Sequence, residues 1–228
     1  MLLRVRVTLP DRPGSLGQVA RTLGVAGADI VQVLVLERLA GRAVDDFTVV
    51  WPGGSRIGRL LAGLNAVPGV QVDGVWTVTS APMSGGQDAE LLAQIAGNPA
   101  DGLATLVDAV PGLLAADWAA AVAVPPDWAD PACRAPSTVV CASWQAPEPL
   151  AIPDVVPLRP RALEAPDGVR YAVAPFGRAG LVLLAARSQD TELPAAAFHR
   201  TEVDRVAQLV RAAAVVLGDR LVSSPAVV

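Results

Sequence analysis

Residues 11–16 read Asp11-Arg12-Pro13-Gly14-Ser15-Leu16, and a second stretch, Gly27-Ala28-Asp29-Ile30, follows shortly after. The first stretch lies between the alternating apolar pattern of residues 3–9 and a helical pattern that begins near Ser15. A turn that opens a helix leaves backbone N–H groups at the positive end of the helix dipole, where a small carboxylate binds readily. We therefore expect residues 11–16 to form a binding loop.

The segments on either side of this loop have clear patterns. Residues 3–9 alternate between apolar and polar, which predicts a strand with one buried face and one solvent-exposed face. Residues 30–38 are apolar at nearly every position, so we expect a second strand with both faces covered. Ala40-Gly41-Arg42 is typical of a hairpin tip. Ser15 is suited to cap a helix whose apolar residues share one stripe, namely Leu16, Val19, Ala20 and Leu23.

The same kind of pattern continues to residue 78. Residues 44–51 predict a third strand, Ser55 begins a second helix, and residues 70–78 predict a last strand. The order is βαββαβ, which folds as a ferredoxin-like antiparallel sheet with two helices on one face. Because this fold hosts many functions, the loop motif has to indicate the function.

With this motif and this element order, residues 1–79 resemble an ACT domain, the small regulatory module that binds amino acids in metabolic enzymes and sensors. The resemblance implies that two copies pair side by side and merge their sheets. The ligand then lies between the loop of one copy and the second strand of the other. The ligand-binding residues that it implies are Asp11, Arg12, Pro13, Gly14, Ser15, Leu16, Asp29 and Ile30.

The chemistry of an amino acid agrees with these positions. Its carboxylate suits the backbone amides of residues 14–16 at the helix start. Its ammonium group suits the carboxylates of Asp11 and Asp29, on which the polar contacts of the family fall. Many members have Asn at one or both of these positions. Two carboxylates favour a ligand with additional positive charge, or else one Asp lies outside the contacts.

The second half of the chain has a different pattern. Residues 80–87 are rich in Ser, Gly and Pro, which predicts a flexible linker. A helix is expected over residues 88–95, and a second one begins at the Asn98-Pro99 pair. Further along, we expect strands at 118–124, 138–144, 169–174 and 181–187, a long loop over the proline-rich residues 146–168, and a final helix over 195–217.

This order resembles a GAF domain over residues 88–218, with residues 219–228 as a tail. The resemblance implies a second α+β domain with a central antiparallel sheet and a long terminal helix. The Asn-Lys, Phe and Asp-Glu pattern of cyclic-nucleotide GAF domains is absent, and no His adjoins Cys133 or Cys141 as bilin attachment requires. We expect a structural GAF-like domain, with a second ligand as the open alternative. The whole chain thus resembles bacterial ACT–GAF regulatory proteins.

Composition excludes several classes of protein. The 228 residues are 52% hydrophobic, enough for a folded core, and all 18 basic residues are Arg, which with 20 Gly and 20 Pro resembles the coding bias of a GC-rich bacterium. A net charge of −4 without a basic cluster argues against a nucleic-acid partner. Neither a signal peptide nor a membrane-spanning stretch is indicated, so we expect a cytoplasmic protein without membrane contact.

The sequence has few side chains that could react or bind a metal. The spacing of Cys133 and Cys141 fits neither a zinc site nor a disulfide framework, so we expect buried thiols. His199 is the one histidine, and we interpret it as solvated or helix-capping. We predict no catalytic residue, metal or cofactor. Trp118, Trp128 and Trp144 are expected in the core. The last helix has an apolar stripe that packs either in the core or against a second copy in a dimer: Val203, Val206, Val210, Ala213 and Leu217.

Three hypotheses for the function follow. The first is a non-enzymatic sensor, a homodimer that binds a free amino acid and signals through its second domain or a partner protein. The second, a hydrolase or transferase, lacks a nucleophile elbow, a P-loop, a dinucleotide motif and a His-paired nucleophile. The third is a structural dimerisation or partner-binding module with a degenerate ligand site.

Overall fold

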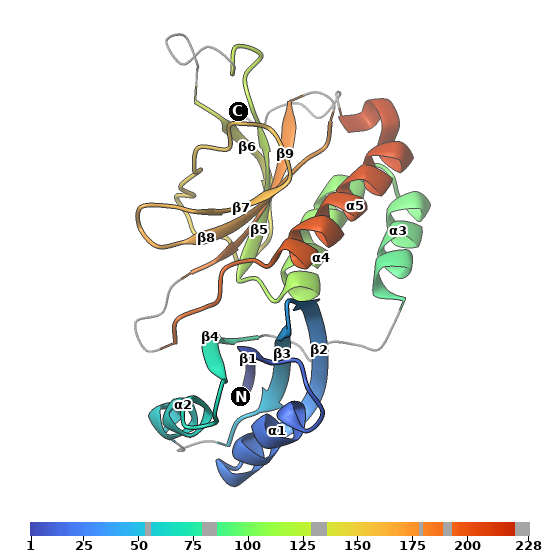
Figure 1. Cartoon of the computed structure of the whole chain (residues 1–228). Coiled ribbons are helices and arrows are strands. Elements are labelled where there is room, and N and C mark those ends of the chain that lie inside the picture. The colour runs from blue at the N-terminus through green and yellow to red at the C-terminus, as the bar shows by residue number, and fades with distance from the viewer. Residues whose placement is uncertain (53–55, 79–85, 129–135, 178–179, 189–192, 222–228) are drawn as a thin grey trace. The chain divides into compact units, whose positions relative to one another are not determined.

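The computed structural model describes residues 1–52, 56–78, 86–128, 136–177, 180–188 and 193–221. It is a mixed α+β protein with two antiparallel sheets, which confirms the predicted fold class (Figure 1). The chain divides into two compact units. The first comprises Met1–Pro82 with Gln189–Ala196, and the second comprises Met83–Ser188 with Ala197–Val228.

The first unit has the predicted βαββαβ order. Within its described residues the strands lie in the order β2-β3-β1-β4, and all neighbours are antiparallel. Strands β1 and β3 are central, so β2 and β4 form the two edges. The elements are β1 (Leu2–Pro10), α1 (Ser15–Val25), β2 (Asp29–Leu39), β3 (Arg42–Val50), α2 (Ile57–Asn65) and β4 (Gln71–Thr77).

The core of this unit lies between one face of the sheet and the two helices. The alternation of β1 turns its apolar residues to this face, where they are buried against α1 and α2. Burial of each such side chain contributes about 1.5–3 kcal/mol. Leu16 is 41% exposed, so its predicted place in the buried stripe of α1 is wrong. It lies in the first turn, beside the loop cavity described below.

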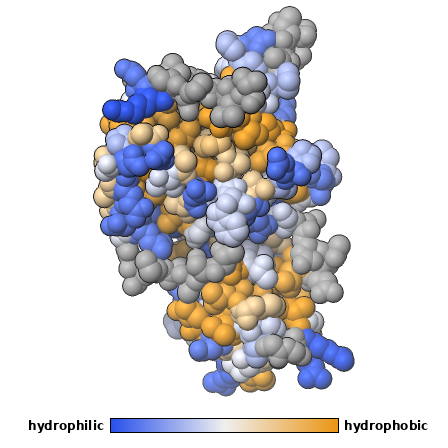
Figure 2. All heavy atoms as spheres, turned by 180° about the vertical axis from the view of Figure 1, so that it is seen from behind, coloured by the Kyte–Doolittle hydropathy of each residue, from blue (hydrophilic) through white to orange (hydrophobic). Residues whose placement is uncertain are grey.

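The prediction that both faces of the second strand are covered is wrong for this chain alone. Val33, Leu34 and Val35 of β2 are each more than 40% exposed. The reason is that β2 is an edge strand with only β3 beside it. Apolar residues reach the surface in other places as well, seen as orange areas on the face that Figure 2 shows.

In the second unit one sheet lies between helices and a long loop. The described strands have the order β6-β5-β9-β8-β7. Helices α3, α4 and α5 cover one face (Figure 1), and the segment around Leu150, Ile152 and Val155 covers the other. The elements are α3 (Gln87–Gly97), α4 (Gly102–Leu114), β5 (Trp118–Ala123), β6 (Thr138–Ala142), β7 (Arg161–Glu164), β8 (Arg170–Pro175), β9 (Leu181–Arg187), α5 (Arg200–Leu217) and a short 3₁₀ helix, Gly218–Leu221.

Several boundaries in this unit differ from expectation. Strand β7 lies inside the stretch expected as loop, because it pairs with β8 despite the prolines around it. Asn98 and Pro99 do not start α4, whose N-cap is Asp101. His199 is the N-cap of α5. Its ring accepts a hydrogen bond from the Thr201 N–H, and the side chain of Glu202 accepts one from the His199 N–H. This capping box confirms the capping interpretation.

The side chains predicted to fill the core of the second unit are mostly buried. The whole stripe of α5 packs in the core, as expected for a core helix. Trp118 is buried on the face of the sheet away from the helices, and Trp128 is partly buried against the same cluster. Trp144 is 83% exposed, so its predicted burial is wrong, because it follows the short edge strand β6.

Residues 193–196 belong with the first unit although they precede α5. The Val75 N–H of β4 donates to the Pro194 carbonyl at 2.9 Å, and Leu193 packs against the first core. A Cβ on Gly74 would lie 2.4 Å from the Ala196 nitrogen, so the close approach needs glycine. This extended stretch explains why α5 begins at Arg200 and not near residue 195.

Some sequence predictions fall outside the described residues. These are most of the linker 80–87, most of the tail 219–228, the helix start at Ser55, and Cys133.

Candidate functional site

The loop of residues 11–16 is held against the end of the β2–β3 hairpin. The Asp11 N–H donates to the Gly41 carbonyl at 2.9 Å. Arg38 Nε donates to both carboxylate oxygens of Asp11 at 3.0 Å, and Arg38 Nη2 lies 2.8 Å from Asp11 Oδ1. These contacts join the loop to β2, so the two form walls of one cavity.

This loop cavity has a volume of about 370 Å³. Sites for small molecules usually measure ~300–1,000 Å³, so one small ligand fits. All residues of the loop 11–16 line it, together with Val35 and Arg38 of β2 and Ala43 and Asp45 of β3. The structure thus brings together six of the eight predicted site residues.

Helix α1 opens at this cavity, and no side chain in the described ranges caps its start. Its N-cap is Gly14, with φ 88° and ψ −15°, a left-handed conformation that favours glycine. Ser15 is the first helical residue, and its side chain forms no cap within the described residues, so the prediction that it caps α1 is wrong. The Ser15 N–H donates to the Arg12 carbonyl at 3.3 Å, and the Gln18 N–H donates to the Gly14 carbonyl at 3.1 Å. The N–H groups between them, of Leu16 and Gly17, belong to the first turn, which has no intrahelical acceptor, and they are the ones suited to an anion in the cavity.

Asp29 and Ile30 do not line the loop cavity. They begin β2, whereas Val35 and Arg38 reach the cavity from its second half. At about 3.3 Å per residue, Asp29 is roughly 20–30 Å from these two residues along the strand. Asp29 is exposed, and Ile30 packs on the edge of the first core. Within one chain, these two predicted residues are therefore separate from the other six.

Asp45 is a site residue that the sequence interpretation missed. It is 1% exposed, and neither carboxylate oxygen has a hydrogen-bond partner among the described residues. Burial raises the pKa of Asp45, the carboxylates of Asp11 and Asp46 raise it further, and Arg38 offsets part of the effect. An ionisable group in this state is typical of functional sites.

A signal for Asp45 was present in the sequence. Residues on one face of a strand recur with a period of two, and Ala43, Phe47 and Val49 of β3 face the helices. Asp45 occupies the same face, opposite Val7 of β1. A carboxylate in an otherwise apolar row is the pattern that could have identified it.

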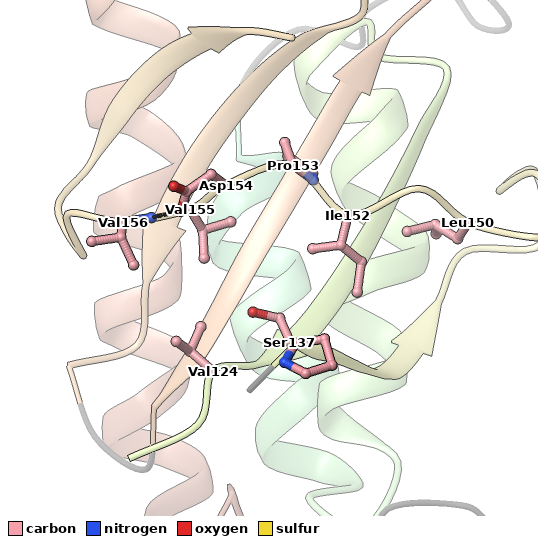
Figure 3. Close-up of a pocket in the computed structure, with 9 residues that line it drawn as sticks. Val124, Ser137, Leu150, Ile152, Pro153, Asp154, Val155 and Val156 are labelled. Carbon is pink, nitrogen blue, oxygen red and sulfur yellow. Dashed lines mark hydrogen bonds between the residues drawn. The ribbon is translucent and has the colours of Figure 1, made fainter. Parts of the chain in front are cut away.

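The second unit has a cavity of about 610 Å³ beside Val124, just after β5. Figure 3 shows Leu150, Ile152 and Val155 on the segment that passes over the sheet. Asp154 is the one charged residue among the described lining, and its Oδ1 accepts from the Val156 N–H at 3.0 Å. The loop cavity, with two arginines and two aspartates, is therefore the stronger candidate site.

Other features of the described residues give weaker indications of a functional site. Cys141 is half-buried, and burial raises the pKa of its thiol to about 11, so it is a poor nucleophile. In the described part of the chain, no cluster of His, Cys, Asp and Glu could hold a metal ion. Among the helices of that same part, none has the length and apolar character needed to cross a membrane.

Comparisons with known proteins add little. No family model and no curated protein matches the chain. One similar solved structure is a formyltetrahydrofolate deformylase from Pseudomonas putida KT2440, with 15% identity, a TM-score of 0.29, and coverage of 43% of this chain and 39% of that one. Another is an unknown protein from Galdieria sulphuraria, with 14% identity, a TM-score of 0.28, and coverage of 97% and 93%.

Proposed function

We propose that the first unit is an ACT domain that binds a free amino acid in the loop cavity, and that the chain is a non-enzymatic sensor. The observation that carries this proposal is the pairing of an uncapped helix start with carboxylates in one small cavity. The helix start suits the carboxylate of an amino acid, and Asp11 suits its ammonium group. A zwitterion therefore matches the charges of the cavity.

The proposal includes a homodimer formed through β2. An apolar edge strand with exposed backbone groups is suited to pair with a second copy. Such a pairing would satisfy the outer backbone groups of the strand and place side chains of the partner strand beside Val33, Leu34 and Val35. It supplies the edge contact that β2 lacks in one chain.

Two-fold pairing also gives Asp29 a role. When two copies of β2 run antiparallel around an axis at Leu34, each Asp29 lies opposite Leu39 of the other strand. The partner subunit's Asp29 would then be beside Arg38, at the wall of the loop cavity. Ligand binding and dimerisation would be linked, so that each strengthens the other.

We further propose that the second unit is a GAF-like domain that relays the state of the ACT dimer to a partner protein in the cytoplasm. Its central antiparallel sheet and long α5 support this resemblance. Its cavity lacks the paired charges of the loop cavity, so we assign the amino acid to the first unit.

A thermal-shift screen with the twenty amino acids, combined with light scattering, tests this function. We expect one class of amino acid to raise the unfolding temperature and to favour the dimer. The variant Val33→Lys places a charge on the edge and should yield monomers that bind more weakly. Val25→Lys is the matched control, since Val25 is 86% exposed on α1 of the same unit and should leave both properties unchanged.

The outcomes separate the hypotheses. A dimer that no amino acid stabilises would favour the structural dimerisation module with a degenerate site. A monomer at high micromolar concentration with no response to amino acids would contradict the ACT proposal as a whole.

A further inference from the structure

Asp45 lies at the floor of the loop cavity, in the middle of the sheet. In the strand register it is opposite Val7 of β1 and Val35 of β2. Its neighbours on the same face of β3, Ala43 and Phe47, are apolar and buried. An apolar residue would fit this row, so the carboxylate has no evident role in the core.

The isolation of Asp45 carries a cost in stability. A buried charge without a hydrogen bond is strongly disfavoured, and native proteins rarely keep one without a reason. The charged groups that act on Asp45 are Asp11 from the loop, Arg38 from β2 and Asp46 from β3. Arg38, the one cation among them, is engaged bidentately by Asp11. Asp46 belongs to the other face, where Arg6 binds it.

The rim of the cavity differs from its floor. At the rim are the start of α1, Arg12, and the Asp11–Arg38 pair, whose side chains are 27% and 68% exposed. Opposite charges side by side there match the carboxylate and ammonium groups of an amino acid. The floor offers one carboxylate that accepts no hydrogen bond from the described part of the chain, which matches a second cation farther along the same ligand.

We propose that Asp45 receives the cationic side chain of the ligand, so that the cavity selects basic amino acids. The proposal rests on the proposed function, because it takes the head of the amino acid to bind at the rim. The volume of about 370 Å³ suits a single amino acid of the size of lysine, ornithine or arginine. A neutral amino acid of the same shape would leave the carboxylate of Asp45 without a partner.

Binding of a basic ligand also has a proton signature. Burial and the neighbouring carboxylates raise the pKa of Asp45 in the empty cavity, so this carboxyl group holds its proton up to a higher pH than an ordinary aspartate does. An incoming guanidinium or ammonium group favours the carboxylate form, and the proton leaves to the solvent. A neutral ligand releases no proton from this group.

Calorimetric titration of the full chain with matched ligands tests the proposal. Arginine is compared with citrulline, and lysine with norleucine, which replace the cation by a neutral group of similar shape. We expect the basic ligand of at least one pair to bind roughly tenfold to a hundredfold more tightly than its neutral match, the scale of a charge-assisted hydrogen bond. Titrations in two buffers of different ionisation enthalpy should show proton release for the basic ligand.

Asp45→Asn keeps the shape of the side chain and removes its charge. This variant should lose the preference for the basic ligand. Asp73→Asn is the matched control, because Asp73 is exposed on β4 of the same sheet and lies outside the lining of the cavity. The control should retain the preference of the wild type.

The results that would overturn the proposal are distinct. Equal affinity for the basic and neutral members of both pairs would overturn it while leaving the proposed function intact. An Asp45→Asn variant that keeps the preference, or that unfolds more readily than the wild type without ligand, would assign Asp45 a structural role and overturn it as well. Failure of the wild type to bind any amino acid would overturn the proposed function and this inference together.

Discussion

Asp45 and Asp46 are consecutive residues with opposite surroundings. Both are almost fully buried, at 1% and 2% exposure, and they face opposite sides of β3. Asp46 accepts hydrogen bonds from Arg6 Nε at 2.7 Å and from Arg6 Nη2 at 2.8 Å. Asp45 has no hydrogen-bond partner among the described residues.

The difference indicates what each carboxylate does. A buried carboxylate that accepts two hydrogen bonds from one arginine has its charge paired, and removing it lowers the stability of the fold because the arginine is left buried without its partner. A buried carboxylate with no hydrogen bond lowers stability, and its retention points to a ligand. Two substitutions one residue apart should therefore have opposite effects on stability.

The largest effect is expected from Asp46→Ala. It leaves the guanidinium of Arg6 buried without its main partner, which typically costs about 3–5 kcal/mol. Urea unfolding of the full chain measures the loss. The double variant Arg6→Met/Asp46→Leu is the control and should cost less than the single change, since the guanidinium of Arg6 is removed together with its partner. The guanidinium of Arg4, 3.9 Å from Asp46, loses this contact in both variants and does not distinguish them. A larger loss in the double variant would contradict this account.

Gly74→Val should have the next largest effect. Gly74 is opposite Arg6 in the register of β1 and β4, and its added side chain would meet the backbone of Ala196. Overpacking of this kind costs about 1–3 kcal/mol. Gly24→Val, at a site where a Cβ meets nothing within 4 Å, serves as the control in the same denaturation experiment. Equal losses in both variants would mean that the approach of residues 194–196 contributes little.

A gain in stability is expected from Asp45→Asn without ligand. Removing a buried charge should stabilise the protein by about 1 kcal/mol at neutral pH, or about 2–4 °C in the unfolding temperature for a chain of this size. Differential scanning calorimetry measures this shift. A lower unfolding temperature in the variant would show that the carboxylate has a stabilising contact.

The size of this gain should depend on pH. Because the pKa of Asp45 is raised in the folded protein, the folded state holds this proton more tightly than the unfolded chain does. The resulting stabilisation is complete below the ordinary value of 3.8 and is lost as pH rises through the raised pKa. The advantage of Asp45→Asn should thus be small at acid pH and grow toward neutral pH. A gain that shrinks over this range in parallel melting curves would contradict the sign of the shift.

Local patterns predicted much of the fold. The hairpin at Gly41 and the stripe of α5 each depend on neighbouring residues, and the structure agrees with them. The alternation of β1 predicted its apolar face, but the expectation that its other face is solvent-exposed is wrong, because Arg4 and Arg6 are buried there. Strand β7 and the late start of α5 depend on partners far along the chain, which propensity does not reveal. The exposure of β2 has a similar cause. The sequence of an apolar strand is the same whether the residues that pack against it come from its own chain or from a second copy.

The candidate site was predicted only in part. The loop motif identified residues 11–16, because glycine and the turn before a helix are local features. Asp45 required knowledge of which face of β3 meets the helices, and the Asp11–Arg38 pair required the register of the hairpin. The place of Asp29 depends on a second copy of the chain.

The most direct measurement is the pKa of Asp45 itself, with and without ligand. Carboxyl carbon resonances followed by NMR through a pH titration report this value, and Asp45→Asn assigns the signal. We predict a raised pKa in the empty protein and a clear decrease when arginine or lysine is bound, with no decrease for citrulline or norleucine. An ordinary pKa in the empty protein, or a raised one that the basic ligands leave unchanged, would contradict the account.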